Sequence, residues 1–382
     1  MNTVLPEQRD ALSDGDKTAL LDTVDTRFRS ATTKYVQRLM ASSDAIRRQF
    51  APSYLEALEF GRLEPFEEGK NNSGIYGLER IYEDRAVLTP YFGCASYCRY
   101  CFKKARTLGG PNTRMSEDDI DRALAFIAAD PRITTALITG GDPLAKPEVT
   151  IRMVERLVAI PHVTKVRIGT RHVLFRPETI TDDLADTIAS FNRVDPENPL
   201  RSRNVTVGVS LNHPDELQPE VITALTKFTR RGVAVRGQTA LLKGINDDAA
   251  VLRHLIDIFL AIGVTPYYLF HCMDVVGTFH MRTSVQRGID LLAQLAEFSG
   301  TYAMPYVYVT PVGKHRVGPG VNLQYETIDG KRYIRTRSPY RAARFFEFSG
   351  KTVLPALHEV DADGYIVSRY LDGDDVPVDY GV

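Results

Sequence analysis

The chain has no tryptophan and only four cysteines among its 382 residues. Four cysteines are too few for the disulfide framework that staples small secreted domains. The first twenty residues lack the apolar core of a signal peptide, and no apolar run approaches the ~20 residues that span a membrane. These absences predict a protein of a reducing, cytoplasmic compartment that has no membrane partner.

An excess of charge of either sign is also lacking. Lysines and arginines number 47, aspartates and glutamates number 48, and the formal net charge is −1. Proteins that bind nucleic acid usually carry a basic surface, whereas the basic segments here, 102–106 and 314–316, are short. We therefore expect no nucleic-acid partner. The 43% of hydrophobic residues can form a large core in one domain or two.

Three of the four cysteines lie within the segment CASYCRYCF. Cys94, Cys98 and Cys101 have the spacing C-x3-C-x2-C, and no histidine or fourth cysteine is near them in sequence. A structural zinc site takes four protein ligands, and a [4Fe–4S] cluster normally takes four thiolates. With three thiolates, one iron of such a cluster is open to another ligand. We predict a [4Fe–4S] cluster whose open iron takes part in chemistry, with zinc as the less favoured alternative.

The hydrophobic pattern predicts three regions. Residues 1–80 form a helical region, residues 81–323 form an α/β domain, and residues 324–382 form an extension of unassigned role. In the α/β domain, six β-rich runs alternate with helical segments, a pattern typical of a parallel sheet with right-handed crossovers. We expect a partial (β/α)6 TIM-type barrel after the N-terminal helical region. A doubly wound open sheet is the alternative.

Polar residues and cysteines cluster where the predicted strands end. A barrel of this type places its active site at the C-terminal ends of its strands. The residues at this predicted edge are the three cysteines, Thr139–Asp142, Arg171, His213, Gln238, Cys272 and Asp274. Their position predicts one shared site.

The segment TGGDPL, Thr139–Leu144, ends the second predicted strand. Glycine lets backbone N–H groups approach a ligand closely, and Asp142 can accept hydrogen bonds from an ammonium group. An ordinary turn is the alternative. Together with the cysteines, the segment resembles the radical SAM superfamily. This resemblance implies that Thr139, Gly140, Gly141 and Asp142 help to bind S-adenosylmethionine (SAM), which a one-electron reductant cleaves to a 5′-deoxyadenosyl radical.

Further segments narrow the resemblance. CRYCFKK, ITGGDPL, VRIGTR, LNHPDE, GQTALLKGIND, PYYLFHC and HMRTSVQRGI occur in the same order as segments of the lysine 2,3-aminomutase family. The similarity extends from about Glu83 to Pro319. It implies a 1,2-amino shift that uses SAM and pyridoxal 5′-phosphate (PLP). It also implies a position near SAM and the substrate for Gln238. Arg171 and His213 are expected to contact SAM from their positions at the strand ends, with loop stabilisation as the alternative.

The same resemblance implies a PLP site. Lys314, in VTPVGKHRVGPG, resembles the lysine that forms a Schiff base with PLP, although the preceding glycine-rich stretch is shorter than usual in the family. Arg85 matches an arginine that contacts the PLP phosphate, and Tyr82 matches a nearby aromatic residue. A second phosphate-binding arginine of the family falls on Ile81, beside Arg80.

The substrate-binding positions depart from the family. The arginine that binds the substrate carboxylate is replaced by Lys103, which keeps the charge but loses the planar fork. The two aspartates that hold the side-chain ammonium of lysine fall on Met273 and Thr310, and Asp274 is one residue away. We therefore expect Lys103 and Asp274 in the substrate site and predict a PLP-dependent 2,3-aminomutase of an α-amino acid other than lysine.

Two other function classes stay open on the sequence alone. A PLP-independent radical SAM enzyme of the same family would dehydrate or epimerise a small molecule without needing Lys314. An iron–sulfur regulator or electron carrier would leave TGGDPL and the polar strand ends without a role. The sequence leaves open whether the chain forms a homo-oligomer.

Overall fold

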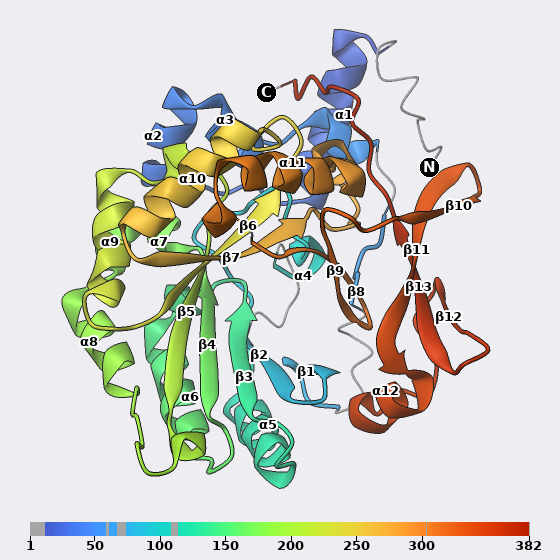
Figure 1. Ribbon diagram of the computed structural model, residues 1–382. Helices are drawn as coiled ribbons and strands as arrows, with labels where there is room; N and C mark the ends of the chain where they lie inside the picture. The colour runs from blue at the N-terminus through green and yellow to red at the C-terminus, as the bar shows by residue number, and fades with distance from the viewer. Residues whose placement is uncertain (1–11, 59–60, 67–73, 108–113, 303, 382) are drawn as a thin grey trace.

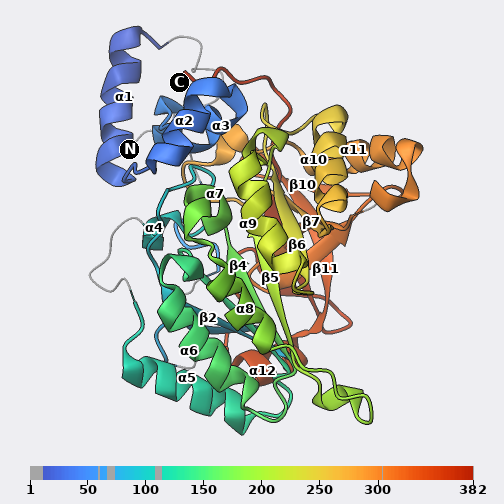
Figure 2. The same cartoon turned by 90° about the vertical axis from the view of Figure 1, so that its left-hand side faces the viewer.

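The computed structural model describes residues 12–58, 61–66, 74–107, 114–302 and 304–381. No helix within these ranges is both long and apolar enough to cross a membrane. Figures 1 and 2 show three parts: N-terminal helices, a central sheet with its surrounding helices, and a C-terminal sheet.

The central sheet has nine strands that are hydrogen-bonded in sequence order. Its strands are β1 (Leu78–Tyr82), β2 (Arg85–Tyr91), β3 (Thr135–Gly140), β4 (Lys165–Thr170), β5 (Asn204–Ser210), β6 (Val235–Leu241), β7 (Val264–His271), β8 (Tyr306–Thr310) and β9 (Gly313–Val317). Strands β2 to β8 pair in parallel, while β1 and β9 pair antiparallel with their neighbours. The six predicted strands correspond to β2–β7, so the predicted parallel sheet is confirmed.

The two edge strands meet and nearly close the barrel. The backbone N–H of Lys314 in β9 donates a hydrogen bond to the Tyr82 hydroxyl at the end of β1, at 2.9 Å. The partial TIM-type barrel is therefore confirmed, and the doubly wound open sheet is wrong. Because the sheet curves round until β1 and β9 meet, residues from the first and the last strand face the same barrel interior.

Helices cover the outer face of the parallel strands (Figure 2). They are α5 (Glu117–Ala129), α6 (Pro147–Val158), α7 (His172–Phe175), α8 (Asp182–Ser190), α9 (Pro219–Thr229), α10 (Ala249–Ala261) and α11 (Val285–Phe298). Their starts carry local signals: Ser116 caps α5 by accepting the N–H of Asp119, whose carboxylate accepts the Ser116 N–H in return. Such a capping box satisfies N–H groups that have no partner within the helix.

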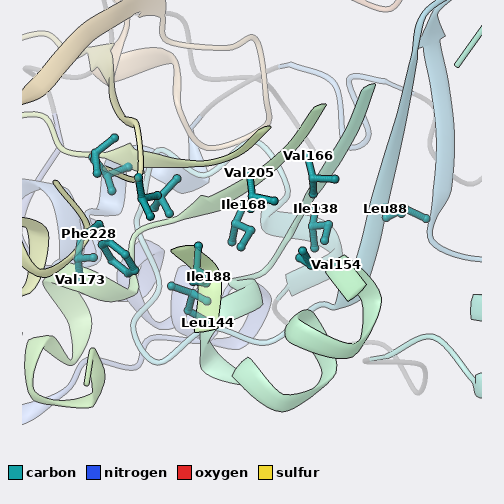
Figure 3. Close-up of a cluster of buried hydrophobic side chains, with 14 of the residues drawn as sticks. Leu88, Ile138, Leu144, Val154, Val166, Ile168, Val173, Ile188, Val205 and Phe228 are labelled. Carbon is teal, nitrogen blue, oxygen red and sulfur yellow. The ribbon is translucent and has the colours of Figure 1, made fainter. Parts of the chain in front are cut away.

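The main core lies between the sheet and these helices. Side chains alternate across a strand, so in β4 Val166 and Ile168 point to the helices while Arg167 lines the barrel interior. Figure 3 shows Ile168 beside Ile138 and Val205 of the neighbouring strands, all three fully buried. Burial of one such side chain stabilises the fold by roughly 1.5–3 kcal/mol.

The N-terminal region is helical in its described part from 14 to 57 and lies at the end of the barrel toward which β3–β5 point (Figure 1). It contains α1 (Asp14–Arg27), α2 (Lys34–Ser42), α3 (Asp44–Phe50) and the 3₁₀ helix η2 (Tyr54–Ala57). Thr33 caps α2 with its side chain and also donates a hydrogen bond to the Phe175 carbonyl of α7, at 2.8 Å. These helices therefore pack directly on the barrel.

The C-terminal residues form a second, antiparallel sheet of order β10-β11-β13-β12. Its elements are β10 (Gln324–Ile328), β11 (Lys331–Arg341), α12 (Ala342–Ser349), β12 (His358–Val360) and β13 (Tyr365–Leu371). Tyr370 of β13 stacks on Tyr308 of β8 at 4.4 Å and its hydroxyl lies 2.8 Å from His271 Nδ1. Beyond this sheet, Tyr380 accepts a hydrogen bond from Ser53 beside η2, at 2.7 Å. The extension thus covers one edge of the barrel and returns to the N-terminal helices.

Candidate functional site

The barrel encloses a cavity of about 350 Å³, within the range of small-molecule sites. The interior faces of the strands line it together with the cysteine loop, residues 92–103, which follows β2. The predicted site residues along its wall are Tyr82, Arg85, Cys94, Cys98, Cys101, Lys103, Thr139, Gly140, Gly141, Asp142, Arg171, Gln238 and Lys314. Nearly all of the predicted site residues therefore line the same cavity.

Two predicted site residues do not line this cavity. His213 caps the 3₁₀ helix η7 (Pro214–Glu216), where its Nδ1 accepts the backbone N–H of Asp215 at 3.2 Å. Asp274 is half-buried behind the wall, and burial raises the pKa of its carboxyl. His213 thus has the loop-stabilising position that the sequence left as an alternative.

The cysteine loop is anchored to the N-terminal helices through its backbone. The N–H of Tyr97 donates to the carbonyl of Ala31 at 2.9 Å, and the N–H of Arg99 donates to the carbonyl of Gln49 at 2.8 Å. Burial raises the pKa of all three thiols in the loop, that of Cys101 to about 11. Without a bound cation, these thiols stay protonated at neutral pH.

A buried cluster of charged side chains also holds the cysteine loop against the N-terminal helices. The Arg99 guanidinium donates two hydrogen bonds to Glu56 of η2, at 2.7 and 2.6 Å, and Lys104 donates to Glu56 at 2.7 Å. All three side chains are at most 1% exposed. Burial would raise the pKa of Glu56, but Lys104 and Arg99 hold it below its usual value. Sequence reasoning missed Glu56, because nothing in the helical segment marks it as a partner of the loop.

The glycines of TGGDPL allow close packing of two backbones. A Cβ on Gly141 would lie 2.3 Å from the Gly93 carbonyl oxygen. The N–H groups of Gly141 and Asp142 donate to the carbonyls of Tyr91 and Gly93, at 3.0 and 2.9 Å. Both amides therefore bind the backbone that leads into Cys94, and the assignment of this segment to SAM stays a prediction.

Asp142 is a buried acceptor that links two strands. Its carboxylate accepts hydrogen bonds from Leu144 N at 3.0 Å, Thr170 Oγ1 at 2.7 Å and Arg171 N at 2.7 Å. Burial raises its pKa to about 6. Asp142 lies in the cavity wall and fixes the end of β3 against the end of β4.

Arg171 and Gln238 are both held at the wall. The Arg171 guanidinium donates to Cys98 Sγ at 3.1 Å and to Glu216 Oε1 at 2.8 Å. Gln238 of β6 extends across Gly208 of β5, where a Cβ would lie 2.6 Å from the Gln238 amide nitrogen. Gly208 therefore leaves the space that this side chain occupies.

Lys314 also lines the cavity, in the β8–β9 hairpin. Its Nζ is 4.6 Å from the ring centroid of Tyr268. Burial, followed by the nearby charges of Arg167 and Arg85, lowers the pKa of Lys314 to about 7. A lowered pKa makes the neutral, nucleophilic form of the amine more accessible near neutral pH.

Two arginines beside Lys314 have unused donors. The Nε atoms of Arg85 and Arg167 are buried and have no hydrogen-bond partner among the described residues. Both arginines line the cavity. Sequence reasoning identified Arg85 but missed Arg167, whose signal is its inward position in the strand VRIGT.

The positions that bind the substrate in the family do not all lie in the cavity of this chain. Lys103 is 5% exposed, and its Nζ lies 3.8 Å from the carboxylate of Glu79, an acidic wall residue that sequence reasoning missed. Met273 lines the cavity. Thr310 is instead buried in the hairpin turn, where its hydroxyl lies 3.1 Å from His315 Nε2. The family's two aspartate positions thus place no carboxylate in this cavity.

Comparison with known proteins decides the family. The sequence model of the radical SAM superfamily matches residues 88–255. A putative L-lysine 2,3-aminomutase of Aquifex aeolicus is 32% identical over 358 residues, which cover 92% of this chain and 91% of that protein. This chain belongs to the lysine 2,3-aminomutase family of the radical SAM superfamily.

Other members of the family differ in their named substrates. An L-lysine 2,3-aminomutase of Fusobacterium nucleatum is 30% identical and covers 88% of this chain and 75% of its own length. A glutamate 2,3-aminomutase of Clostridioides difficile is 31% identical and covers 82% of this chain and 72% of its own length. The chain is thus a radical SAM amino acid 2,3-aminomutase, whose cofactors are a [4Fe–4S] cluster, SAM and PLP.

The residues present fit this family's cluster. The three thiols of the cysteine loop line one cavity, yet within the described ranges no three His, Cys, Asp or Glu side chains form a site for a single metal ion. A cubane has a separate iron for each thiolate, so its ligands need not meet at one point. Bound iron would also deprotonate the thiols.

The residues fit PLP as well. The cavity wall offers an amine with a lowered pKa, at Lys314, and buried guanidinium nitrogens without partners, on Arg85 and Arg167. A guanidinium is well suited to a phosphate, which accepts charge-assisted hydrogen bonds. Both features lie in the cavity that the cysteine loop completes.

Proposed function

We propose that this aminomutase acts on an α-amino acid other than lysine, with Cys94, Cys98 and Cys101 as the cluster ligands and Lys314 as the PLP lysine. The observation that carries the proposal is the shared cavity, which holds the three thiols and the amine of Lys314 with its lowered pKa. When bound, the cluster and SAM supply a 5′-deoxyadenosyl radical, and PLP supplies the carbonyl group that binds the substrate amine.

In this proposal the chain's own residues divide the cavity into two sides. Arg85 and Arg167 bind the PLP phosphate through their unused donors, and Tyr82 holds the Lys314 backbone through the hydrogen bond between β1 and β9. Gln238 and the segment Thr139–Asp142 form the SAM side, next to the cysteine loop. The amine and the cluster ligands then face the substrate from different walls.

The substrate's side chain is proposed to carry no ammonium group. A buried ammonium needs an anionic partner, and the described residues of the cavity wall include two carboxylates, Asp142 and Glu79. Asp142 already accepts three hydrogen bonds, and Glu79 lies 3.8 Å from Lys103. Lys103 supplies the positive charge for the substrate carboxylate. Met273 is apolar and faces the same space.

The test is anaerobic reconstitution with iron, sulfide, PLP and SAM, followed by dithionite and a panel of α-amino acids. We expect 5′-deoxyadenosine and a β-amino acid from a substrate with a neutral side chain, and no β-lysine from lysine. Turnover of lysine at a rate comparable to the best substrate would contradict the substrate assignment. The panel includes arginine and glutamate, because Glu79 and Lys103 offer a charge of each sign.

A second arm tests the PLP site. Lys314→Ala should remove the visible absorption band of lysine-bound PLP and the aminomutase activity while the iron content stays unchanged. Borohydride reduction of the wild type should attach PLP to the peptide that contains Lys314. If the wild type forms 5′-deoxyadenosine but never acquires this band, the PLP-independent alternative holds instead.

A further inference from the structure

Arg171 is a predicted SAM contact whose side chain is hydrogen-bonded to other protein groups. It follows β4 directly and is 6% exposed. One terminal nitrogen, Nη1, lies 3.1 Å from Cys98 Sγ and is also hydrogen-bonded to the Tyr100 hydroxyl. The other, Nη2, donates to Glu216 Oε1 and Gln49 Oε1, both at 2.8 Å. Both terminal nitrogens therefore have protein partners.

The partners of Arg171 are themselves fixed. Glu216 is fully buried and also accepts the Asn212 N–H at 2.9 Å and the Gln49 side-chain amide at 2.8 Å. Gln49 comes from α3 and Glu216 from η7, so two separate elements orient the guanidinium through its Nη2 atom. Nη1 donates to the sulfur of Cys98, and Nε is buried without a hydrogen-bond partner among the described residues. A buried arginine held in this way keeps its positive charge and its hydrogen bond at the Cys98 sulfur.

We propose that Arg171 is a positioning residue that sets the reduction potential of the [4Fe–4S] cluster through its hydrogen bond and charge at Cys98, with Glu216 as the opposing charge. The inference rests on the proposed function, because it takes Cys98 as a cluster ligand. Hydrogen bonds to cluster sulfurs and nearby net charge are two of the factors that set such potentials. Reduction adds one negative charge, which a buried cation stabilises and a buried anion destabilises.

This arrangement makes the two partners act with opposite sign. Removing the charge of Arg171 takes away the cation and the N–H···S bond, so the cluster should become harder to reduce. Removing the charge of Glu216 leaves Arg171 uncompensated beside Cys98, so the cluster should become easier to reduce. A residue that only stabilised the loop would have no reason to shift the two potentials in opposite directions.

The experiment is an EPR-monitored redox titration of the reconstituted holoenzyme, without SAM, for the wild type and three variants. Arg171→Gln should lower the equilibrium constant for reduction about tenfold, which is about 59 mV for one electron. Glu216→Gln should raise it by a similar factor, and Arg171→Lys should recover part of the loss because the charge remains. Arg176→Gln is the matched control, because Arg176 lies on the same connection with a side chain that is 52% exposed.

The outcomes separate the two proposals. If the wild type assembles no cluster, the proposed cluster ligands are wrong. If the variants hold the cluster but shift its potential no more than the control does, or shift it in the same direction, the role of Arg171 is refuted. If Arg171→Gln does not fold, Glu216→Gln decides: a raised potential supports the proposal, and an unchanged or lowered potential overturns it.

Discussion

Replacing Lys314 with methionine should stabilise the PLP-free protein, although the substitution removes the proposed PLP lysine. The ammonium of Lys314 lies in a cavity wall beside Arg85 and Arg167, and no described contact pairs it with a carboxylate. Burial and these two positive charges therefore make its protonated form unfavourable in the folded state. Methionine keeps most of the apolar stem and removes the charge.

The size of the effect follows from the pKa of Lys314, which is lowered from 10.5 to about 7. Each pKa unit corresponds to about 1.36 kcal/mol, so folding with a protonated Lys314 costs up to about 5 kcal/mol. Below pH 7 the proton is bound in both states and the full cost is present. Between pH 7 and 10.5 only the unfolded chain keeps the proton, so the cost falls by about 1.4 kcal/mol per pH unit.

The assay is anaerobic urea unfolding of the PLP-free wild type and Lys314→Met at about pH 6 and about pH 9. We expect the variant to be more stable by about 2–5 kcal/mol at the lower pH, because water in the cavity hydrates part of the charge, and the gain to shrink at the higher pH. Lys165→Met, at an exposed position of β4, is the control and should show no such trend. A gain that does not change with pH, or a variant less stable than the wild type at the lower pH, would refute the reasoning.

Three further substitutions test the cysteine loop and its supports. Cys98→Ala should abolish the visible absorbance of the cluster and lower the iron content, whereas Cys272→Ala, a buried cysteine outside the motif, should keep both. Gly141→Ala should destabilise the protein by about 1–3 kcal/mol in urea unfolding, because its Cβ would meet the Gly93 carbonyl at 2.3 Å. Glu56→Gln should cost about 3–5 kcal/mol in the same assay, because two buried cations lose their anion; an effect below about 1 kcal/mol would show that water or another anion replaces it.

The sequence predicts most of the barrel because strand–helix alternation is a local pattern with one common solution. Each predicted run from 85 to 271 became a parallel strand, and their ends brought Cys94, Asp142 and Gln238 to one cavity. The edge strands were harder to predict. Strand β9 is short and antiparallel, and its contact with β1 depends on the Tyr82 hydroxyl, 232 residues away in sequence.

The site was predictable as a set of residues but not as a set of contacts. A glycine pair is equally suited to a ligand and to a neighbouring backbone, and the sequence does not show that a Cβ on Gly141 would lie 2.3 Å from the Gly93 carbonyl oxygen. In the same way, the position of Arg171 at a strand end does not reveal that its side chain binds Glu216 and Cys98. Both arrangements depend on partners from distant segments of the chain, and no local pattern encodes them.

The N-terminal helices lie outside the barrel, yet their side chains and backbone hold residues of the candidate site. Gln49 accepts the Arg99 backbone N–H and the Arg171 side chain, while Glu56 binds the Arg99 side chain. The cysteine loop is thus fixed on one side by residues from before β1 and on the other by the TGGDPL backbone. Because Glu56, Arg99 and Lys104 would lose their buried partners if the loop moved, the loop is held in place before any cofactor binds. The N-terminal helices therefore help to fix the proposed cluster ligands in position.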